Sequence, residues 1–170
     1  ADWNRVLSVD DGGLSEDLVT SLLGTMAQTA APDMSLRHLR MCLEHWDNPC
    51  AWLKFLESHP RAVEILTRLF VNSQFLTEVL VKNPEFLQRL TESRRLAEVR
   101  SRDEFLDDMT ACAEAATANS QDPLDAIRRV RRWEFLRIAA CDCFGLMDHR
   151  RVTLQLSLLA DACIQAVMNV

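Results

Sequence analysis

The chain has few residues that break helices. In 170 residues it has four glycines, five prolines and no tyrosine. This argues against a turn-rich β-protein, and the abundant Leu, Ala, Arg and Glu favour helix. Gly12-Gly13 follows no expected strand, so no phosphate-binding glycine motif is present. No apolar run approaches the ~20 residues that span a bilayer, and no signal peptide opens the chain. We therefore expect an all-α cytoplasmic protein.

A disulfide framework is not expected either. The six cysteines lie mostly within apolar helical patterns, and a chain that is 48% hydrophobic can build a core without crosslinks. Cys141 and Cys143 stand two positions apart, roughly 200° around a helix, which suits neither a redox pair nor chelation. We predict buried, reduced thiols.

Positive charge is scarce outside one segment. Residues 126–151 carry seven arginines and three carboxylates, a net +4, whereas the rest carries twelve basic and twenty-two acidic side chains, a net −10. An acidic body argues against binding to nucleic acid or an anionic membrane, because phosphate neutralisation needs a broad basic surface.

Proline marks the expected helix starts. Four residue pairs that end in proline each precede an apolar periodic segment: Asn48-Pro49, His59-Pro60, Asn83-Pro84 and Asp122-Pro123. The first residue of such a pair can cap a helix with its side chain, and the φ of the proline suits the first helical position. We predict one helical domain over residues 1–170, an irregular multi-helix bundle that ends in a long antiparallel helix pair. The expected helices are 14–29, 34–46, 49–58, 60–71, 74–82, 84–92, 102–118, 123–144 and 149–169.

The arginine-rich helix carries a carboxylate on its apolar side. Glu134 falls among Ile127, Ile138 and Cys141, where an unpaired charge would be costly. Arg131 and Arg137 stand three residues on either side of it, so we predict a buried network that fixes the helix register.

A second interpretation concerns the other faces of the same helix. Arg128, Arg129 and Arg132 form a separate sector that could dock a following domain or an acidic partner. Asp161 of the last helix could bridge to an arginine of the preceding one, or remain solvated.

A metal site is a weaker hypothesis. His38, Cys42 and His45 share a helix face at a spacing that zinc accepts, but no fourth ligand is evident. Packing of core histidine and cysteine explains the pattern better, and zinc stays open as an alternative.

Two runs of sequence carry a family resemblance. They are IRRVRRWEFLRIA at 127–139, closed by Gly145, and LSLLADA at 156–162. Earlier segments, PRAVEILTRLF at 60–70 and NPEFL at 83–87, add to it. Together they resemble the N-terminal helical part of bacterial glutamine synthetase adenylyltransferases, over about residues 35–170. Cys141 stands where that pattern usually has an arginine before Asp142, which puts in doubt any salt bridge by that arginine.

The resemblance implies a larger parent enzyme. The parent would transfer AMP from ATP to a tyrosine of glutamine synthetase and remove it by phosphorolysis, under control of a nitrogen signal protein and glutamine. Its nucleotidyltransferase domains, with ATP and magnesium, would follow Val170. The expected Gly-rich turn and paired aspartates are not in this sequence, so no catalytic, cofactor or metal residue is carried over.

We accordingly expect a non-catalytic fragment that covers and orients the first catalytic domain. The chain ends in a segment that looks mid-helical, which favours a fragment. The alternative is a free-standing helical interaction module. A fragment should expose an apolar patch around Val152, Leu156 and Val167 and tend to self-associate.

Overall fold

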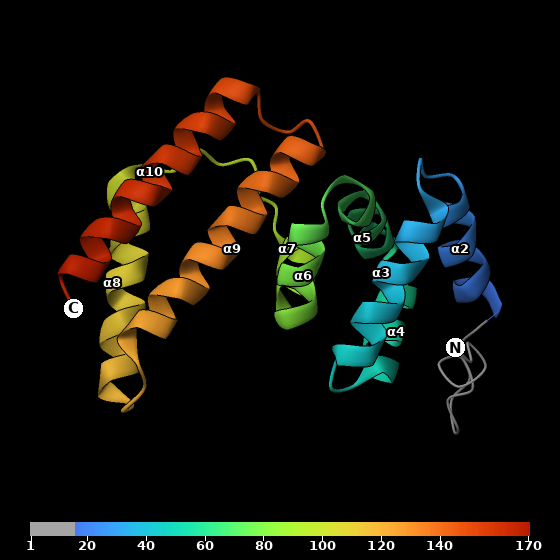
Figure 1. Cartoon of the computed structure of the whole chain (residues 1–170), viewed down its shortest axis with the longest axis horizontal. Coiled ribbons are helices and arrows are strands. Elements are labelled where there is room, and N and C mark those ends of the chain that lie inside the picture. The colour runs from blue at the N-terminus through green and yellow to red at the C-terminus, as the bar shows by residue number, and fades with distance from the viewer. Residues whose placement is uncertain (1–15) are drawn as a thin grey trace. The chain divides into compact units, whose positions relative to one another are not determined.

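The computed structural model describes residues 16–170, and everything it describes outside turns and loops is α-helix (Figure 1). The helices are α2 (Glu16–Ala27), α3 (Pro32–His45), α4 (Pro49–Ser58), α5 (Pro60–Asn72), α6 (Gln74–Lys82), α7 (Glu85–Glu92), α8 (Arg102–Ala118), α9 (Pro123–Cys143) and α10 (His149–Met168). The predicted all-α class is therefore confirmed. The expected helix ends agree with these bounds to within about two residues.

Prolines stand at most of the predicted starts, but only some of the preceding residues cap. Asn48 Oδ1 accepts from Ala51 N at 3.0 Å, and Asp122 Oδ1 accepts from Leu124 N at 2.8 Å. Asn83 instead donates its side-chain amide to Val79 O at 2.8 Å and ends α6, so α7 begins after Pro84 without a side-chain cap. An Asn-Pro pair in this chain can thus cap the helix that follows it, as at Asn48, or end the helix before it, as at Asn83.

The chain divides after Ser93 into two compact units. In the N-terminal unit, α5 is central and packs against α2, α3, α4, α6 and α7. It buries Leu66, Leu69 and Phe70 because its apolar residues form one broad face, whereas Glu64 and Arg68 lie on its exposed side. The prediction of one domain over the whole chain stays a prediction.

The C-terminal unit is built from three longer helices. α8, α9 and α10 all pack against one another, and α9 and α10 form the predicted antiparallel pair (Figure 1). Gly145 makes the turn between them with φ +66°, and Leu146 N donates to Cys141 O at 2.8 Å behind it. A glycine suits this left-handed position because a Cβ would be strained there.

Of the helices described, none is both long enough and apolar enough to cross a bilayer.

Candidate functional site

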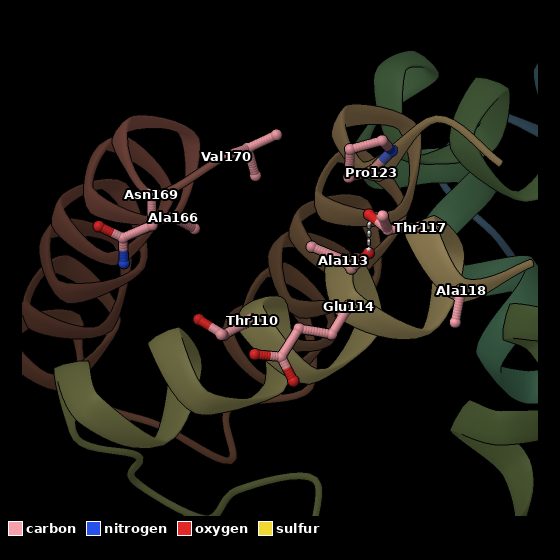
Figure 2. Close-up of a pocket in the computed structure, with 9 residues that line it drawn as sticks. All are labelled: Thr110, Ala113, Glu114, Thr117, Ala118, Pro123, Ala166, Asn169 and Val170. Atoms are coloured by element: carbon pink, nitrogen blue, oxygen red, sulfur yellow. Dashed lines mark hydrogen bonds between the residues drawn. The ribbon is translucent and has the colours of Figure 1, made fainter. Parts of the chain in front are cut away.

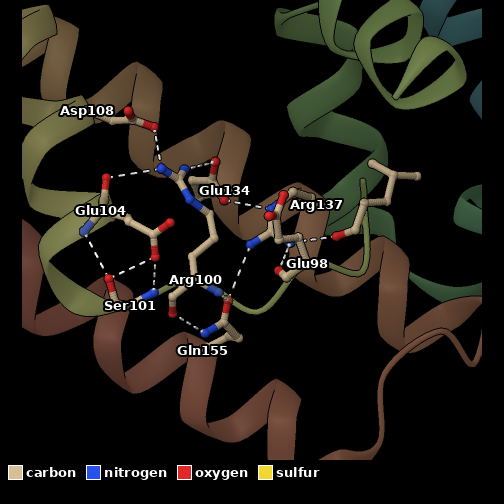
Figure 3. A network of polar contacts seen from close by, with 9 residues as sticks. Glu98, Arg100, Ser101, Glu104, Asp108, Glu134, Arg137 and Gln155 are labelled. Carbon is tan, nitrogen blue, oxygen red and sulfur yellow. Dashed lines mark hydrogen bonds and ion pairs between the residues drawn. The ribbon is translucent and has the colours of Figure 1, made fainter. Parts of the chain in front are cut away.

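The most developed polar site is a network around Glu134 in the C-terminal unit (Figure 3). The Glu134 side chain is 2% exposed. Its Oε2 accepts from Arg137 Nε at 2.7 Å and its Oε1 accepts from Arg100 Nη1 at 2.9 Å. Each carboxylate oxygen thus has a charged donor, which offsets the cost of burial.

Arg100 connects this centre to α8. Its Nη2 donates to Asp108 Oδ2 at 2.7 Å and to Glu104 O at 3.0 Å, and its guanidinium lies 5.0 Å from the centre of the Phe105 ring. Burial alone would lower the pKa of Arg100, but the hydrogen bond that it donates to Asp108 and the charges of Glu134 and Asp108 outweigh it. The pKa is raised overall, so the guanidinium stays cationic.

Gln155 ties the same arginine to α10. Arg100 N donates to Gln155 Oε1 at 2.9 Å, and Gln155 Nε2 donates to Arg100 O at 2.6 Å. The side-chain amide thus pairs with a backbone amide as a neighbouring strand would. Gln155 is fully buried, and Arg137 Nη2 also lies 3.5 Å from its Oε1.

The segment before α8, residues 96–101, is held along its length, and we name it the strap. Arg137 Nη1 donates to Leu96 O at 2.6 Å and to Glu98 O at 3.1 Å. Cys141 Sγ donates to Leu96 O at 3.1 Å, and burial raises the pKa of this thiol. The strap is neither helix nor strand, and its backbone groups are hydrogen-bonded by side chains of α9 and α10.

Ser101 ends the strap and starts α8 with a capping box. Its hydroxyl accepts from Glu104 N at 3.2 Å, and Glu104 Oε2 accepts from Ser101 N at 2.7 Å. The Ser101 hydroxyl also donates to Glu104 Oε2 at 2.8 Å. The hydrogen bonds to this carboxylate, from Ser101 N first and from the Ser101 side chain second, lower the pKa of Glu104. The box therefore fixes where the strap gives way to helix.

The network matches a structural role better than a chemical one. Each carboxylate oxygen of Glu134 accepts from one guanidinium group, and the Arg137 donors are occupied by Glu134, Leu96 and Glu98. A general base must lie within reach of a substrate proton. Glu134 is 2% exposed and lies between two guanidinium groups, so this arrangement serves to hold structural elements together.

A pocket of about 460 Å³ lies elsewhere in the same unit (Figure 2). It is formed by α8, the start of α9 and the end of α10, and its polar side chains are Thr110, Glu114, Thr117 and Asn169. Thr117 Oγ1 already donates to Ala113 O at 3.0 Å. A lining with one carboxylate and no cation is poorly suited to a triphosphate.

The predicted arginines separate into buried and exposed groups. Arg137 pairs with Glu134 as the sequence suggested, but the second partner is Arg100 and not Arg131. Arg131 is exposed, and its charge opposes the burial that raises the pKa of Cys163 on α10. Its charge therefore acts on α10 and not on Glu134.

The remaining sector of α9 is on the surface. Arg128, Arg129 and Arg132 are all exposed. Arg128 pairs with Asp125 at 2.6 Å and lies 4.0 Å from Asp122. The predicted grouping of these three arginines on one exposed sector is present, and its docking role stays a prediction.

Of the two alternatives for Asp161, a bridge to an arginine of α9 and a solvated carboxylate, the described residues show the second. Asp161 and Asp142 are exposed, and within residues 16–170 neither makes an ion pair. The buried stripe of α10 is Val152, Gln155, Leu159, Ala162 and Ala166. Leu156 and Cys163 are only half-buried and Val167 is exposed, because each follows a residue of the buried stripe by one position, which is about 100° around the helix.

The expected apolar patch is also placed differently. Val152 is buried and Leu156 half-buried, so of the three expected residues only Val167 is exposed. The exposed large apolar side chains of α10 include Leu154, Ile164 and Met168, with Met168 75% exposed. This set lies on the outer side of α10, opposite its buried stripe.

His38, Cys42 and His45 do not come together as metal ligands. His38 Nδ1 lies 3.0 Å from Phe70 O, and its ring contacts the Phe70 ring. Burial raises the pKa of Cys42 to about 12. His45 is exposed, and its Nδ1 lies 2.8 Å from Met41 O. Across residues 16–170 no three His, Cys, Asp or Glu side chains gather so as to hold a metal ion. The zinc hypothesis therefore has no support in this geometry.

Sequence reasoning missed Arg100, Asp108 and Gln155. Arg100 lies 34 positions from Glu134 and 55 from Gln155, so no helical spacing connects them. One signal was available for Gln155, which stands three residues after Val152 and four before Leu159 on a regular apolar stripe.

Comparison with known proteins gives a consistent result. The family model described as Glutamate-ammonia ligase adenylyltransferase matches residues 63–170. Three relatives carry the name bifunctional glutamine synthetase adenylyltransferase/adenylyl-removing enzyme. The one from Mycolicibacterium smegmatis is 29% identical over 94% of this chain, and those from Corynebacterium efficiens and Corynebacterium glutamicum are 27% and 24% identical over 89%.

The match covers a small part of those proteins, since the chain spans 15–16% of their length. No solved structure matches the chain. The family model covers more than half of the chain, including nearly all of α5 and every helix after it. The chain belongs to the glutamate-ammonia ligase adenylyltransferase family.

Proposed function

We propose that this chain is a non-catalytic helical segment of a protein that adenylylates glutamine synthetase and removes the adenylyl group, as the names of its relatives state. The observation that carries the proposal is the family match over residues 63–170, which contains the whole C-terminal unit. The partners expected for such a protein are glutamine synthetase and a nitrogen signal protein in the cytoplasm.

The chemistry would reside outside this chain. ATP and magnesium belong to nucleotidyltransferase domains elsewhere in such a protein. What supports a non-catalytic role for this chain is the burial of Glu134 between Arg100 and Arg137, and a pocket whose lining has no cation. The chain would instead supply a stiff body that covers and orients the first catalytic domain.

The contact with that domain would use the outer face of α9. Arg128, Arg129 and Arg132 are exposed there on a helix whose opposite side is fixed by the Glu134 network. Exposed arginines on a rigid helix suit an acidic surface, since guanidinium groups bind carboxylates with little reorganisation.

A segment exchange tests the proposal. This chain replaces the aligned segment of the Mycolicibacterium smegmatis relative, and transfer of AMP from labelled ATP to glutamine synthetase is measured with magnesium present. The exchanged protein should retain transfer, whereas deletion of the segment should abolish it. An exchanged protein that folds but is as inactive as the deletion would refute the role.

A matched pair of variants in the exchanged protein tests the arginine face. The triple change Arg128→Ala, Arg129→Ala and Arg132→Ala should lower transfer while leaving helical content unchanged. The control is Arg150→Ala with Arg151→Ala, which removes exposed arginines from α10. Equal losses in the two variants would mean that general charge matters and not this face.

The exposed apolar side chains of α10 favour a second proposal, self-association of the isolated chain. Ile164 is 63% exposed and Met168 75% exposed. Apolar side chains grouped on one surface commonly mark an interface. Sedimentation of the purified chain should show concentration-dependent dimers, and Ile164→Glu with Met168→Glu should remove them. A monomer at all concentrations would favour a free-standing module.

A further inference from the structure

The pocket of about 460 Å³ in the C-terminal unit has a size typical of sites for small organic molecules (Figure 2). The two buried residues of its lining are alanines, Ala113 of α8 and Ala166 of α10. Because an alanine side chain ends at Cβ, these positions leave space between the two helices that a longer side chain would fill. Ala118, Pro123 and Val170 extend the apolar part of the lining.

Two polar side chains of α8, Thr110 and Glu114, stand one helical turn apart at this lining (Figure 2). Thr110 is half-buried and Glu114 is exposed. Among the residues that the structure describes, neither side chain has a hydrogen-bond or ion-pair partner. By contrast, Thr117 already donates to a backbone carbonyl, and the Asn169 side chain accepts from a neighbour on α10. The acceptors that remain available at the pocket are therefore the Thr110 hydroxyl and the Glu114 carboxylate.

The chain places no cation where it could pair with Glu114 along α8. The helical neighbours three and four positions away are two threonines and two alanines, at 110, 111, 117 and 118. The lining of the pocket contains no lysine, arginine or histidine. The result is a mainly apolar hollow with one carboxylate at its edge and no counter-charge in its lining.

We propose that this pocket binds a small organic cation, an amine with an apolar body. The apolar body would lie against Ala113 and Ala166, and the ammonium group would contact Glu114 and Thr110. An ammonium group donates hydrogen bonds and accepts none, which matches the acceptors available on these two side chains. An anion would find no cation in the lining, and a neutral molecule would gain the apolar contact alone.

This site is independent of the proposed function. It uses neither the Glu134 network nor the exposed arginines of α9, and all of its lining residues belong to the C-terminal unit. Failure of the segment exchange would therefore leave the ligand site standing, and failure to bind an amine would leave the segment exchange standing.

Three probes of similar shape and different charge test the site in the intact chain: benzylamine, benzyl alcohol and benzoate. NMR titration measures binding as saturable shifts of the backbone amides of Ala113, Glu114 and Ala166. We expect benzylamine to bind most tightly, benzyl alcohol more weakly and benzoate most weakly. Equal affinities for the three probes, a preference for benzoate, or no saturable shift of these amides with millimolar benzylamine would overturn the proposal.

A matched pair of variants tests the role of the charge. Glu114→Gln keeps the shape of the side chain and should weaken benzylamine binding about fivefold, the effect of losing a partly exposed ion pair, while benzyl alcohol binding stays the same. The control is Asp107→Asn, which removes one negative charge from an exposed position of α8 outside the lining. It should leave benzylamine binding unchanged. Equal losses in the two variants would mean that the amine responds to the net charge of −6 and not to this site.

A second pair of variants tests the role of the space. Ala118→Leu places a larger side chain at the lining and should weaken benzylamine and benzyl alcohol by about the same factor. Ala115→Leu is the control, because Ala115 is an exposed residue of the same helix that does not line the pocket. Leucine suits the interior of a helix, so both variants should fold. Equal affinities in the two variants would place the amine elsewhere on the surface and contradict the site.

Discussion

The two units satisfy their buried polar groups in opposite ways. In the N-terminal unit, the buried Ser35, Thr67, Thr77, Asn83 and Thr91 each donate to a backbone carbonyl four residues earlier in their own segment. In the C-terminal unit, Glu134, Arg137 and Gln155 bind partners 34 to 55 positions away. Among residues 16–93, His38 is a long-range exception, since its Nδ1 lies 3.0 Å from Phe70 O and 3.5 Å from Thr77 Oγ1.

The difference concerns what fixes the arrangement of the helices. Bonds within one helix place no constraint on its neighbours, so the N-terminal unit depends on the fit of apolar side chains around α5. Directional hydrogen bonds and ion pairs between α8, α9, α10 and the strap specify how these elements are positioned along one another, and not only that they pack together. We therefore expect the C-terminal unit to lose most stability when one member of its polar network is removed. The N-terminal unit should lose most stability when a buried apolar side chain is shortened.

The largest effect should come from Arg137→Ala. It leaves Glu134 buried with one cation and removes a charged donor from the carbonyls of Leu96 and Glu98, so we expect a loss of about 3–5 kcal/mol in the free energy of unfolding. Urea unfolding followed by circular dichroism measures it. Arg128→Ala is the control, because its pair with Asp125 is exposed and should stabilise by less than about 1 kcal/mol. Equal losses would remove the distinction between the units.

A cavity in the N-terminal unit should have a somewhat smaller effect. Leu66 is fully buried on α5, and Leu66→Ala should cost about 2–5 kcal/mol through lost burial and an unfilled space. Hydrogen exchange should place the loss of protection in residues 16–93. If the amides of α9 lost as much protection as those of α5, the units would not be independent in stability.

The capping box should contribute less. Ser101→Ala removes the hydroxyl that accepts from Glu104 N, and a lost N-cap costs about 1 kcal/mol. The pKa of Glu104 is below its ordinary 4.5 in the folded chain, so its stabilising contribution is complete above that value and is lost as the pH falls through the folded pKa. The difference between the variant and the unaltered chain should therefore shrink in acid, and a constant difference would contradict this.

The smallest effect should come from Thr67→Val. The Thr67 hydroxyl donates to Val63 O, which the helix already uses, so its loss leaves no acceptor without a donor. We expect a change within about 0.5 kcal/mol, measured by the same urea titration as for Arg137→Ala. A loss comparable to that of Arg137→Ala would show that local and long-range polar bonds are equally important here.

The sequence predicted most of what depends on local spacing. Proline positions and apolar periodicity placed the helices, and the three-residue spacing from Glu134 identified Arg137. The sequence could not identify Arg100, because residues of different segments have no helical spacing that would predict their contact. The sequence missed Gln155 for a related reason, since hydropathy places a glutamine on the surface unless its distant partner is known.

The central claim is that this chain supports adenylyl transfer without performing it. The most direct test incubates the purified chain with labelled ATP, magnesium and glutamine synthetase, and measures label on the synthetase. Our account predicts no incorporation above that seen without the chain, under conditions in which a complete relative labels the synthetase fully. Label transferred by this chain alone would contradict it.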